Sequence, residues 1–334
     1  MPSAAVDFDC SVVIPAFNAA ATITGAVHSV LAQRLPCREV IVVDDGSTDA
    51  TREIAQKIDS DRVRVLAQSN GGPSAAKNAG IRASGGRYVA FLDSDDLWLP
   101  TYLEAISVAL QRDPRAGLAY TDAYVFDGAT LRVRRQTAMH APDPPPADRL
   151  AFLSALLERN FVFTSATVPA GVLAQVGGYP ESRTMSEEYE LWLRILIAGY
   201  GATYAPGPHA LYRHHAGQLS SHEVGMSRAL ADVFQALSVD SLPTAQLRQQ
   251  LLARRARAER EARIVGGHAG PASQARRLRR RLGVVRKRLG LTHGWYAEPP
   301  AAVAATLLGL APSTQMRPDL AGRGQAQRAP EDRR

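Results

Sequence analysis

The sequence predicts an α/β protein built on a doubly wound, mostly parallel sheet with helices on both faces. Several short runs in the first 125 residues are rich in Val and Ile and lack polar alternation, which is typical of strands buried on both faces. Each run is followed by a segment with helical periodicity. Regular alternation of strands and helices produces a parallel sheet, because each helix returns the chain to the edge where the next strand begins.

The first part of the chain contains four strand–helix units. The predicted strands are Ser11–Ile14, Glu39–Val43, Arg62–Leu66 and Tyr88–Leu92. The predicted helices that follow them are Ala20–Gln33, Thr48–Ile58 with Ser47 as its N-cap, Pro73–Ala83 and Leu97–Gln111.

The regular alternation ends after Gly117. We expect further strands at Leu118–Phe126, Phe161–Val168, Ala202–Tyr204 and His209–Arg213, and helices at Met185–Ala198, Leu247–Ile264 and Ser273–Leu289. We therefore divide the chain into a core domain at 8–242, with halves 8–117 and 118–242, and a basic helical extension at 243–311. The tail at 312–334 has the composition of a disordered segment.

Composition favours a soluble, cytoplasmic protein. The longest unbroken run of apolar or small residues, Ala301–Ala311, has 11 residues, whereas a membrane-spanning helix needs about 20. The N-terminus carries no secretory signal pattern. Two cysteines, Cys10 and Cys37, are too few for a disulfide framework.

The net charge of +7 is distributed unevenly. From Ala245 onward the chain has 19 Lys and Arg against 6 Asp and Glu, so the basic character belongs to the C-terminal part. Within 273–291, apolar residues share one face of the predicted helix and arginines fill most of the rest. The apolar residues are Leu278, Leu282, Val285 and Leu289. Such a helix can bind an anionic membrane surface.

Other interpretations of the basic segment stay open. It could pack on the core domain with a solvated arginine face, or form a dimer contact. It could also bind nucleic acid, but it lacks interleaved aromatic residues and any zinc or helix-turn-helix signature. We therefore expect no nucleic-acid partner, and peripheral attachment at the inner face of the cell membrane is the favoured interpretation.

Polar residues follow three of the predicted strands, at the edge where open α/β sheets bind ligands. These segments are Pro15–Asn18, Asp44–Ser47 and Asp93–Asp96. A parallel sheet would bring five aspartates to this edge, and a hard divalent cation would relieve their repulsion. Either acidic cluster alone is typical of an ordinary turn, but their joint placement predicts a Mg²⁺ or Mn²⁺ site that serves a phosphorylated ligand.

Three more segments carry candidate site residues. The Gly-rich stretch Gly71–Gly80 contains Lys77 and resembles neither the dinucleotide fingerprint nor a Walker A loop, which argues against a dehydrogenase or an NTPase. Glu187 and Glu188 open a predicted helix, where acidic residues usually complement the helix dipole. His215 follows a short predicted strand, where a lone histidine is more often structural than a ligand.

Together these segments resemble the inverting family 2 glycosyltransferases of GT-A fold, which use nucleotide-sugar donors. The matching segments are Ser11–Asn18, Glu39–Thr51, Gly71–Gly80, Gly85–Trp98, Glu187–Ile195 and, more loosely, Tyr212–Ser220. They occur in the family's order. The resemblance implies a GT-A-type fold in which 8–117 binds the nucleotide sugar and 118–242 binds the acceptor.

The resemblance also implies roles for the donor-side residues. Pro15 and Phe17 would line the nucleobase pocket, and Asp45 would accept a hydrogen bond from the base with Asp44 beside it. The segment Asp93–Ser94–Asp95 matches the Asp-x-Asp motif of the donor site, whose last Asp holds Mg²⁺ or Mn²⁺ on the donor diphosphate.

On the acceptor side, Glu188 falls at the position of the catalytic base, next to Glu187. The family usually has Glu-Asp where this chain has Glu-Glu, and His215 lies where similar enzymes often have an active-site histidine. On the donor side, Lys77 lies where Arg is more common and would bind the nucleotide sugar. The implied partners are a nucleotide-diphosphate sugar and a carbohydrate or lipid-linked acceptor, as in cell-envelope polysaccharide or glycolipid synthesis. The alternative is a nucleotide-sugar-binding protein without catalytic activity.

Overall fold

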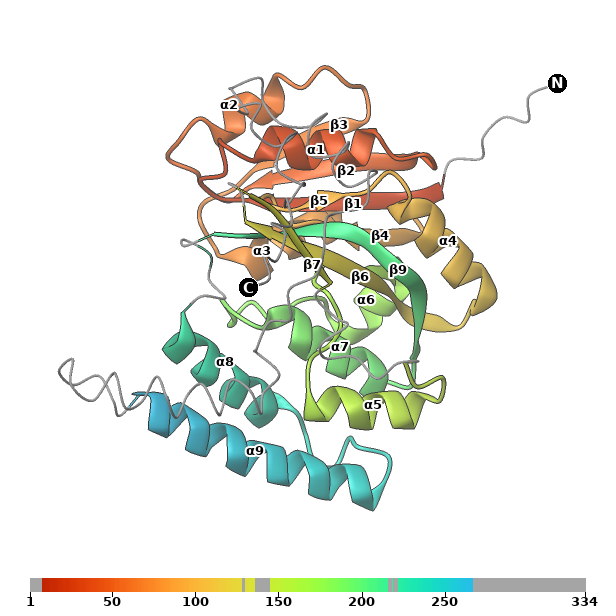
Figure 1. Cartoon of the computed structure of the whole chain (residues 1–334), viewed down its shortest axis with the longest axis vertical. Coiled ribbons are helices and arrows are strands. Elements are labelled where there is room, and N and C mark those ends of the chain that lie inside the picture. The colour runs from red at the N-terminus through yellow and green to blue at the C-terminus, as the bar shows by residue number, and fades with distance from the viewer. Residues whose placement is uncertain (1–7, 128–129, 136–144, 216–217, 219–221, 267–334) are drawn as a thin grey trace, which may run out of the picture.

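The structure is a computed structural model that describes residues 8–127, 130–135, 145–215, 218 and 222–266 (Figure 1). The predicted helix Ser273–Leu289 and the predicted tail 312–334 lie outside these residues. Only the first part of the predicted basic extension, as far as Gly266, is described.

A single sheet forms the centre of the described part. Its strands are β1 (Phe8–Ala16), β2 (Cys37–Asp44), β3 (Val63–Ala67), β4 (Tyr88–Phe91), β5 (Leu97–Trp98), β6 (Ala116–Asp127), β7 (Thr130–Arg135), β8 (Thr167–Pro169) and β9 (Gly201–His214). Their order is β3-β2-β1-β4-β8-β6-β9-β5, and β7 pairs with β6. The helices are α1 (Ile23–Leu31), α2 (Thr51–Gln56), α3 (Pro73–Ala83), α4 (Tyr102–Arg112), α5 (Arg149–Glu158), α6 (Ala170–Val176), α7 (Glu187–Ile197), α8 (Glu223–Ala236) and α9 (Ala245–Gly266).

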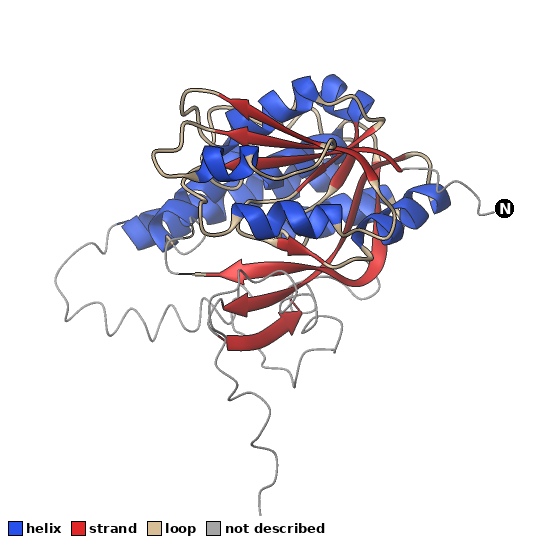
Figure 2. Cartoon of the chain, turned by 90° about the horizontal axis from the view of Figure 1, so that it is seen from above, coloured by secondary structure: helices blue, strands red, loops and turns tan. Residues whose placement is uncertain are grey.

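The strands β1 to β4 form the predicted parallel half of the sheet. Neighbouring residues of one strand point to opposite faces, and both faces are covered by helices (Figure 2). Val12 packs into a core that includes residues of α1 and α4, whereas Val13 packs into a core that includes residues of α5 and α7. Burial on both faces therefore explains the uninterrupted apolar runs.

The register of the parallel half places the predicted ligand-binding segments side by side. Ala16 at the end of β1 pairs with Asp44 at the end of β2, and Val13 pairs with Phe91 at the end of β4. The segments that follow these three strands therefore leave the sheet at the same edge, as predicted.

The other half of the sheet is mixed. The long strands β6 and β9 are parallel to each other, but β8 is antiparallel to both β4 and β6, and β5 is antiparallel to β9. The short strand β8 thus joins the two halves into one sheet, and this half departs from the uniformly alternating pattern of the first.

Several predicted boundaries are wrong. Residues Leu97–Trp98 form the short strand β5 instead of a first helical turn, and α4 begins at Tyr102, beyond Pro100. Ser47 does not cap α2, which begins at Thr51; its hydroxyl instead accepts a hydrogen bond from the backbone N–H of Asn18.

Other elements also differ from the prediction. The two strands expected at 202–204 and 209–213 are one strand, β9, whose pairing with β6 shifts register near Pro206 and Gly207. Only the end of the expected strand Phe161–Val168 pairs, as β8. The sequence did not indicate the helices α5, α6 and α8. In α5 the amphipathic pattern is weak because Leu150 and Ala155, which are not among its buried residues, are apolar as well.

The helix α9 packs against α8 and α5 (Figure 1). Leu247 and Leu251 are buried, and Arg254 donates a hydrogen bond to the carbonyl of Leu157 while its guanidinium lies over the Phe234 ring. No helix in the described ranges is long and apolar enough to span a membrane.

Candidate active site

The loop after β1 is fixed against the loop after β2. Asn18 has a left-handed backbone conformation with φ of 51°, its side-chain oxygen accepts a hydrogen bond from the N–H of Thr48, and its own N–H donates to Ser47. Phe17 beside it is 49% exposed. An exposed ring on a tethered loop can stack on a planar group such as a nucleobase. The half-buried Pro15 precedes it.

Asp44 and Asp45 lie at the end of β2 with both side chains buried. Asp44 accepts a hydrogen bond from the N–H of Ser47 and so shapes the loop that follows. Asp45 accepts hydrogen bonds from the N–H groups of Gly71 (2.9 Å) and Gly72 (2.8 Å), and from the side-chain amide of Gln68 (2.7 Å). In this structure the Asp45 carboxylate therefore holds the Gly-rich loop in front of α3.

The glycines of this loop have a clear steric role. Gly72 has φ of 86°, a conformation that favours glycine, and it precedes Pro73 at the first position of α3. Farther along α3, a Cβ at Gly80 would lie 2.3 Å from a methyl group of Val13, so glycine allows the helix to approach the sheet closely. The close approach brings Lys77 down to the sheet edge.

The segment Asp93–Asp96 forms a turn after β4, closed by a hydrogen bond from the N–H of Asp96 to the carbonyl of Asp93. Ser94 lies within this turn and is half-buried. The carboxylate of Asp95 lies 2.9 Å from Nε2 of His215, and both side chains keep contact with solvent, at 35% and 41% exposure. Asp95 and His215, which are 120 positions apart in the sequence, are thus neighbours in the structure.

Arg213 ties the end of β9 to the same turn. Its side chain donates to the carbonyl of Asp95 (2.7 Å), and its N–H donates to the buried carboxylate of Asp96 (2.8 Å). Asp96 therefore binds the backbone of β9, which holds His215 in place. Sequence reasoning missed this role of Arg213, which had no signal beyond its position beside the histidines.

Lys77 is the centre of a buried cluster of carboxylates. Its Nζ contacts Glu188, lies 3.1 Å from Glu187 and lies 3.5 Å from Asp93. The ammonium also lies 5.2 Å from the centre of the Tyr179 ring. The cluster unites the turn after β4, the middle of α3 and the first turn of α7.

These contacts shift the pKa values of the cluster. Burial raises the pKa of Glu188, the adjacent Glu187 carboxylate raises it further, and Lys77 opposes both, with a resulting pKa of about 7. Burial lowers the pKa of Lys77, but Asp93, Glu188 and Glu187 raise it well above its ordinary value. At neutral pH Lys77 is therefore charged, and Glu188 can take up or release a proton.

Glu190, the third acidic residue at the start of α7, belongs to a different set of contacts. Its carboxylate accepts a hydrogen bond from Arg183 at 2.8 Å, and Arg183 also donates to the carbonyl of Asp232. Glu190 is thus held in an ion pair that links α7 to α8. Glu188, in contrast, combines contact with Lys77 with a pKa that burial raises to about 7.

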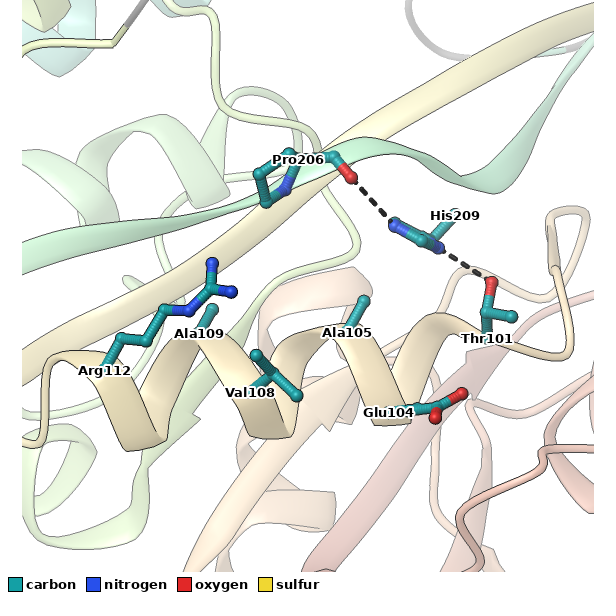
Figure 3. Close-up of a pocket in the computed structure, with 8 residues that line it drawn as sticks. All are labelled: Thr101, Glu104, Ala105, Val108, Ala109, Arg112, Pro206 and His209. Atoms are coloured by element: carbon teal, nitrogen blue, oxygen red, sulfur yellow. Dashed lines mark hydrogen bonds between the residues drawn. The ribbon is translucent and has the colours of Figure 1, made fainter.

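A pocket of about 390 Å³ lies elsewhere, between α4 and β9 (Figure 3). Its wall includes His209, which is hydrogen-bonded to Thr101 and to the carbonyl of Pro206. None of the residues predicted for donor binding or catalysis lines it.

Comparisons with known proteins show the family to which the chain belongs. The family model described as "Glycosyl transferase family 2" matches residues 11–174. The chain is 32% identical over 270 residues to the succinoglycan biosynthesis protein ExoO of Rhizobium meliloti, covering 76% of this chain and 75% of that protein. The chain belongs to glycosyl transferase family 2. It is a nucleotide-sugar-dependent glycosyltransferase, and members of this family invert the anomeric centre.

Two further similarities of the glycosyltransferase are informative. It is 28% identical over 214 residues to WfaP of Escherichia coli, a UDP-Glc:alpha-D-GlcNAc-diphosphoundecaprenol beta-1,3-glucosyltransferase, covering 64% of this chain and 80% of WfaP. The mannosyltransferase PcManGT of Pyrobaculum calidifontis, solved with GDP-Man and Mn²⁺, has a TM-score of 0.58 at 18% identity, covering 93% of this chain and 88% of that chain. The second similarity shows the GT-A-like fold.

The acidic groups of the glycosyltransferase fit an open metal site. Within the described residues, no three His, Cys, Asp or Glu side chains are arranged as a complete set of metal ligands. Asp95 and His215 nevertheless place an oxygen and a nitrogen side by side, within reach of solvent. Mg²⁺ is commonly held by one or two carboxylates together with substrate phosphates, so the solvent-accessible carboxylate of Asp95 fits a site that the donor completes.

Proposed function

We propose that this enzyme transfers a sugar from a nucleotide-diphosphate sugar to a hydroxyl group of a carbohydrate or lipid-linked acceptor in cell-envelope polysaccharide synthesis. One observation carries the assignment of the site: Lys77 contacts both Glu188 and Asp93. Lys77 therefore lies close both to Glu188, which is suited to accept a proton, and to the Asp93–Asp95 motif, which is suited to hold the donor diphosphate.

On the donor side, Phe17 and Pro15 form the wall on which the nucleobase stacks, above Asp44 and Asp45. The Gly-rich loop held by Asp45 faces the phosphates. Asp95 and Asp93 are the residues that would hold Mg²⁺ or Mn²⁺ on the diphosphate, with His215 beside Asp95 and Ser94 in the turn between them. A divalent cation bound there supplies stabilisation of the negative charge that develops on the leaving diphosphate.

On the acceptor side, Glu188 removes the proton of the attacking hydroxyl as the oxygen bonds to the anomeric carbon. The hydroxyl attacks opposite the leaving diphosphate, so a single base is sufficient and the configuration inverts. Glu187 stays buried against Lys77 and sets the charge around the base. The named activities of ExoO and WfaP support an envelope polysaccharide or lipid-linked glycan as acceptor.

The proposal is tested by measuring release of nucleoside diphosphate from a panel of UDP- and GDP-sugars, with undecaprenyl-diphosphate-linked sugars as acceptors. The expected result is acceptor-stimulated release from one donor in the presence of Mg²⁺ or Mn²⁺. Binding of donors without release or transfer under any of these conditions would instead support a binding protein.

The raised pKa of Glu188 predicts how activity depends on pH. Glu188 accepts a proton only when ionised, so kcat/KM is expected to rise about tenfold per pH unit below pH 7 and to level off above it. Folding raises the pKa of Glu188 above its ordinary value of 4.5, so protonated Glu188 favours the folded state at low pH. This contribution to the free energy of unfolding is lost as pH rises through about 7. Titration of Glu188 therefore does not destabilise the fold on the acid side, and a profile flat from pH 5.5 to 8.5 would contradict the assignment.

The basic C-terminal segment is proposed to bring the enzyme to a membrane that carries its acceptor. We expect the full chain to sediment with vesicles that contain phosphatidylglycerol. Binding should weaken as the salt concentration rises from about 50 to about 500 mM, because salt screens the attraction between surface charges over roughly this range. Deletion of residues 273–334 should abolish the binding. Equal binding by the truncated enzyme would remove this role from the segment.

A further inference from the structure

We propose that Lys77 is a positioning residue for Glu188, and that the lengths of these two side chains are matched to each other. The inference rests on the proposed role of Glu188 as the catalytic base. Lys77 is 2% exposed, so its ammonium depends on protein groups for its hydrogen bonds. The partners that the structure gives it are the carboxylates of Glu188, Glu187 and Asp93.

The backbone that carries Lys77 is fixed to the segment that leads into α7. The side-chain oxygen of Asn78 accepts a hydrogen bond from the N–H of Tyr179 at 2.8 Å, and its NH₂ group donates to the carbonyl of Tyr179 at 2.9 Å. One turn earlier, the hydroxyl of Ser74 donates to the carbonyl of Arg183 at 3.0 Å. These hydrogen bonds fix α3 against residues 179–183.

The backbone that carries Glu188 is equally constrained. Ser186, the residue before α7, has φ of 59°, a conformation that costs energy for a residue with a side chain and therefore needs support from its surroundings. The first turn of α7 is also buried, and the hydroxyl of Tyr189 donates to the carbonyl of Leu156. The starting points of both side chains are thus set by contacts other than the one between Lys77 and Glu188.

With both ends fixed, side-chain length decides where the base lies. The Tyr179 ring, whose centre lies 5.2 Å from the ammonium, bounds it on one side. Aspartate at 188 would withdraw the carboxylate by one methylene, and arginine at 77 would extend the cation by a comparable length. Each change alone would misplace the base carboxylate, and the two together would restore its contact with the cation.

The test compares Lys77→Arg, Glu188→Asp and the double variant. Because small misplacements of a reacting group cost up to about 10²-fold, each single variant is expected to lose roughly 10- to 100-fold in kcat, with donor KM changed much less. The double variant should recover to within about fivefold of the wild type, which is strongly non-additive. The matched control, Lys77→Arg with Glu187→Asp, should show no recovery.

A double variant whose loss equals the product of the single losses would overturn the inference, and so would an unchanged kcat in Lys77→Arg. If Glu188→Gln were fully active, the proposed base would be wrong; if Glu188→Gln is inactive but the swap fails to recover, only the matching of lengths is wrong.

A measurement independent of activity uses thermal unfolding. Lys77→Met leaves the buried carboxylates of Glu187 and Glu188 and the partly exposed Asp93 without their cation, and it should lower Tm by roughly 6–10 °C. Glu188→Gln added to Lys77→Met should return part of the loss, because it removes one of the uncompensated charges. An unchanged Tm in Lys77→Met would show that the ammonium does not hold this cluster.

Discussion

Asp95→Ala is expected to lower kcat/KM by on the order of 10²–10³ or more while the fold stays intact. Asp95 is partly exposed at the edge of the sheet, so its removal leaves no buried group without a partner. The lost carboxylate is the one proposed to hold the cation on the donor diphosphate, and the charge on the leaving group would lose that stabilisation.

The measurement is nucleoside diphosphate release at saturating Mn²⁺, with thermal unfolding as the check on folding. Asp9→Ala is a matched control, since Asp9 is an exposed aspartate at the opposite end of β1, paired with Arg38. It should retain full activity. Excess EDTA should reduce the wild type to the level of Asp95→Ala, and full turnover in EDTA would show that no divalent cation is needed.

Glu188→Gln is expected to lower kcat on the order of 10²–10⁴-fold with little change in donor affinity. Glutamine keeps the size of the side chain and can still contact Lys77 through its carbonyl oxygen, but it cannot take a proton from the acceptor. Single-turnover transfer and equilibrium donor binding, measured on the same sample, separate the two effects.

Glu187→Gln and Glu190→Gln serve as controls for this assignment. The Glu187 side chain is 6% exposed against 11% for Glu188, and Glu190 is held by Arg183, so Glu188 is the carboxylate proposed to meet the incoming hydroxyl. Both variants should keep more activity than Glu188→Gln. A nearly active Glu188→Gln beside an inactive Glu187→Gln or Glu190→Gln would identify a different base.

Much of the donor half could be predicted from local sequence. Runs such as Val40–Val43 stay apolar because both faces of the strand are buried, and Pro73 marks the first turn of a helix because its fixed φ suits that position. The prediction failed where long-range pairing overrides local preference. Leu97 and Trp98 extend a helical pattern in the sequence, but β9 offers them backbone partners, and Pro100 separates them from α4.

The sequence by itself determined which residue types gather at one edge of the sheet, since parallel strands must end on the same side. Only the tertiary structure decided which of them meet. Asp45 binds its own Gly-rich loop, Asp95 meets His215, and Lys77 joins Asp93 to Glu188 across more than 90 residues of chain. The physical reason is that the direction of a side chain depends on how its helix or strand packs, and packing is set by residues far away in the chain. The approach of α3 to β1, allowed by Gly80, is the packing that brings Lys77 to the base.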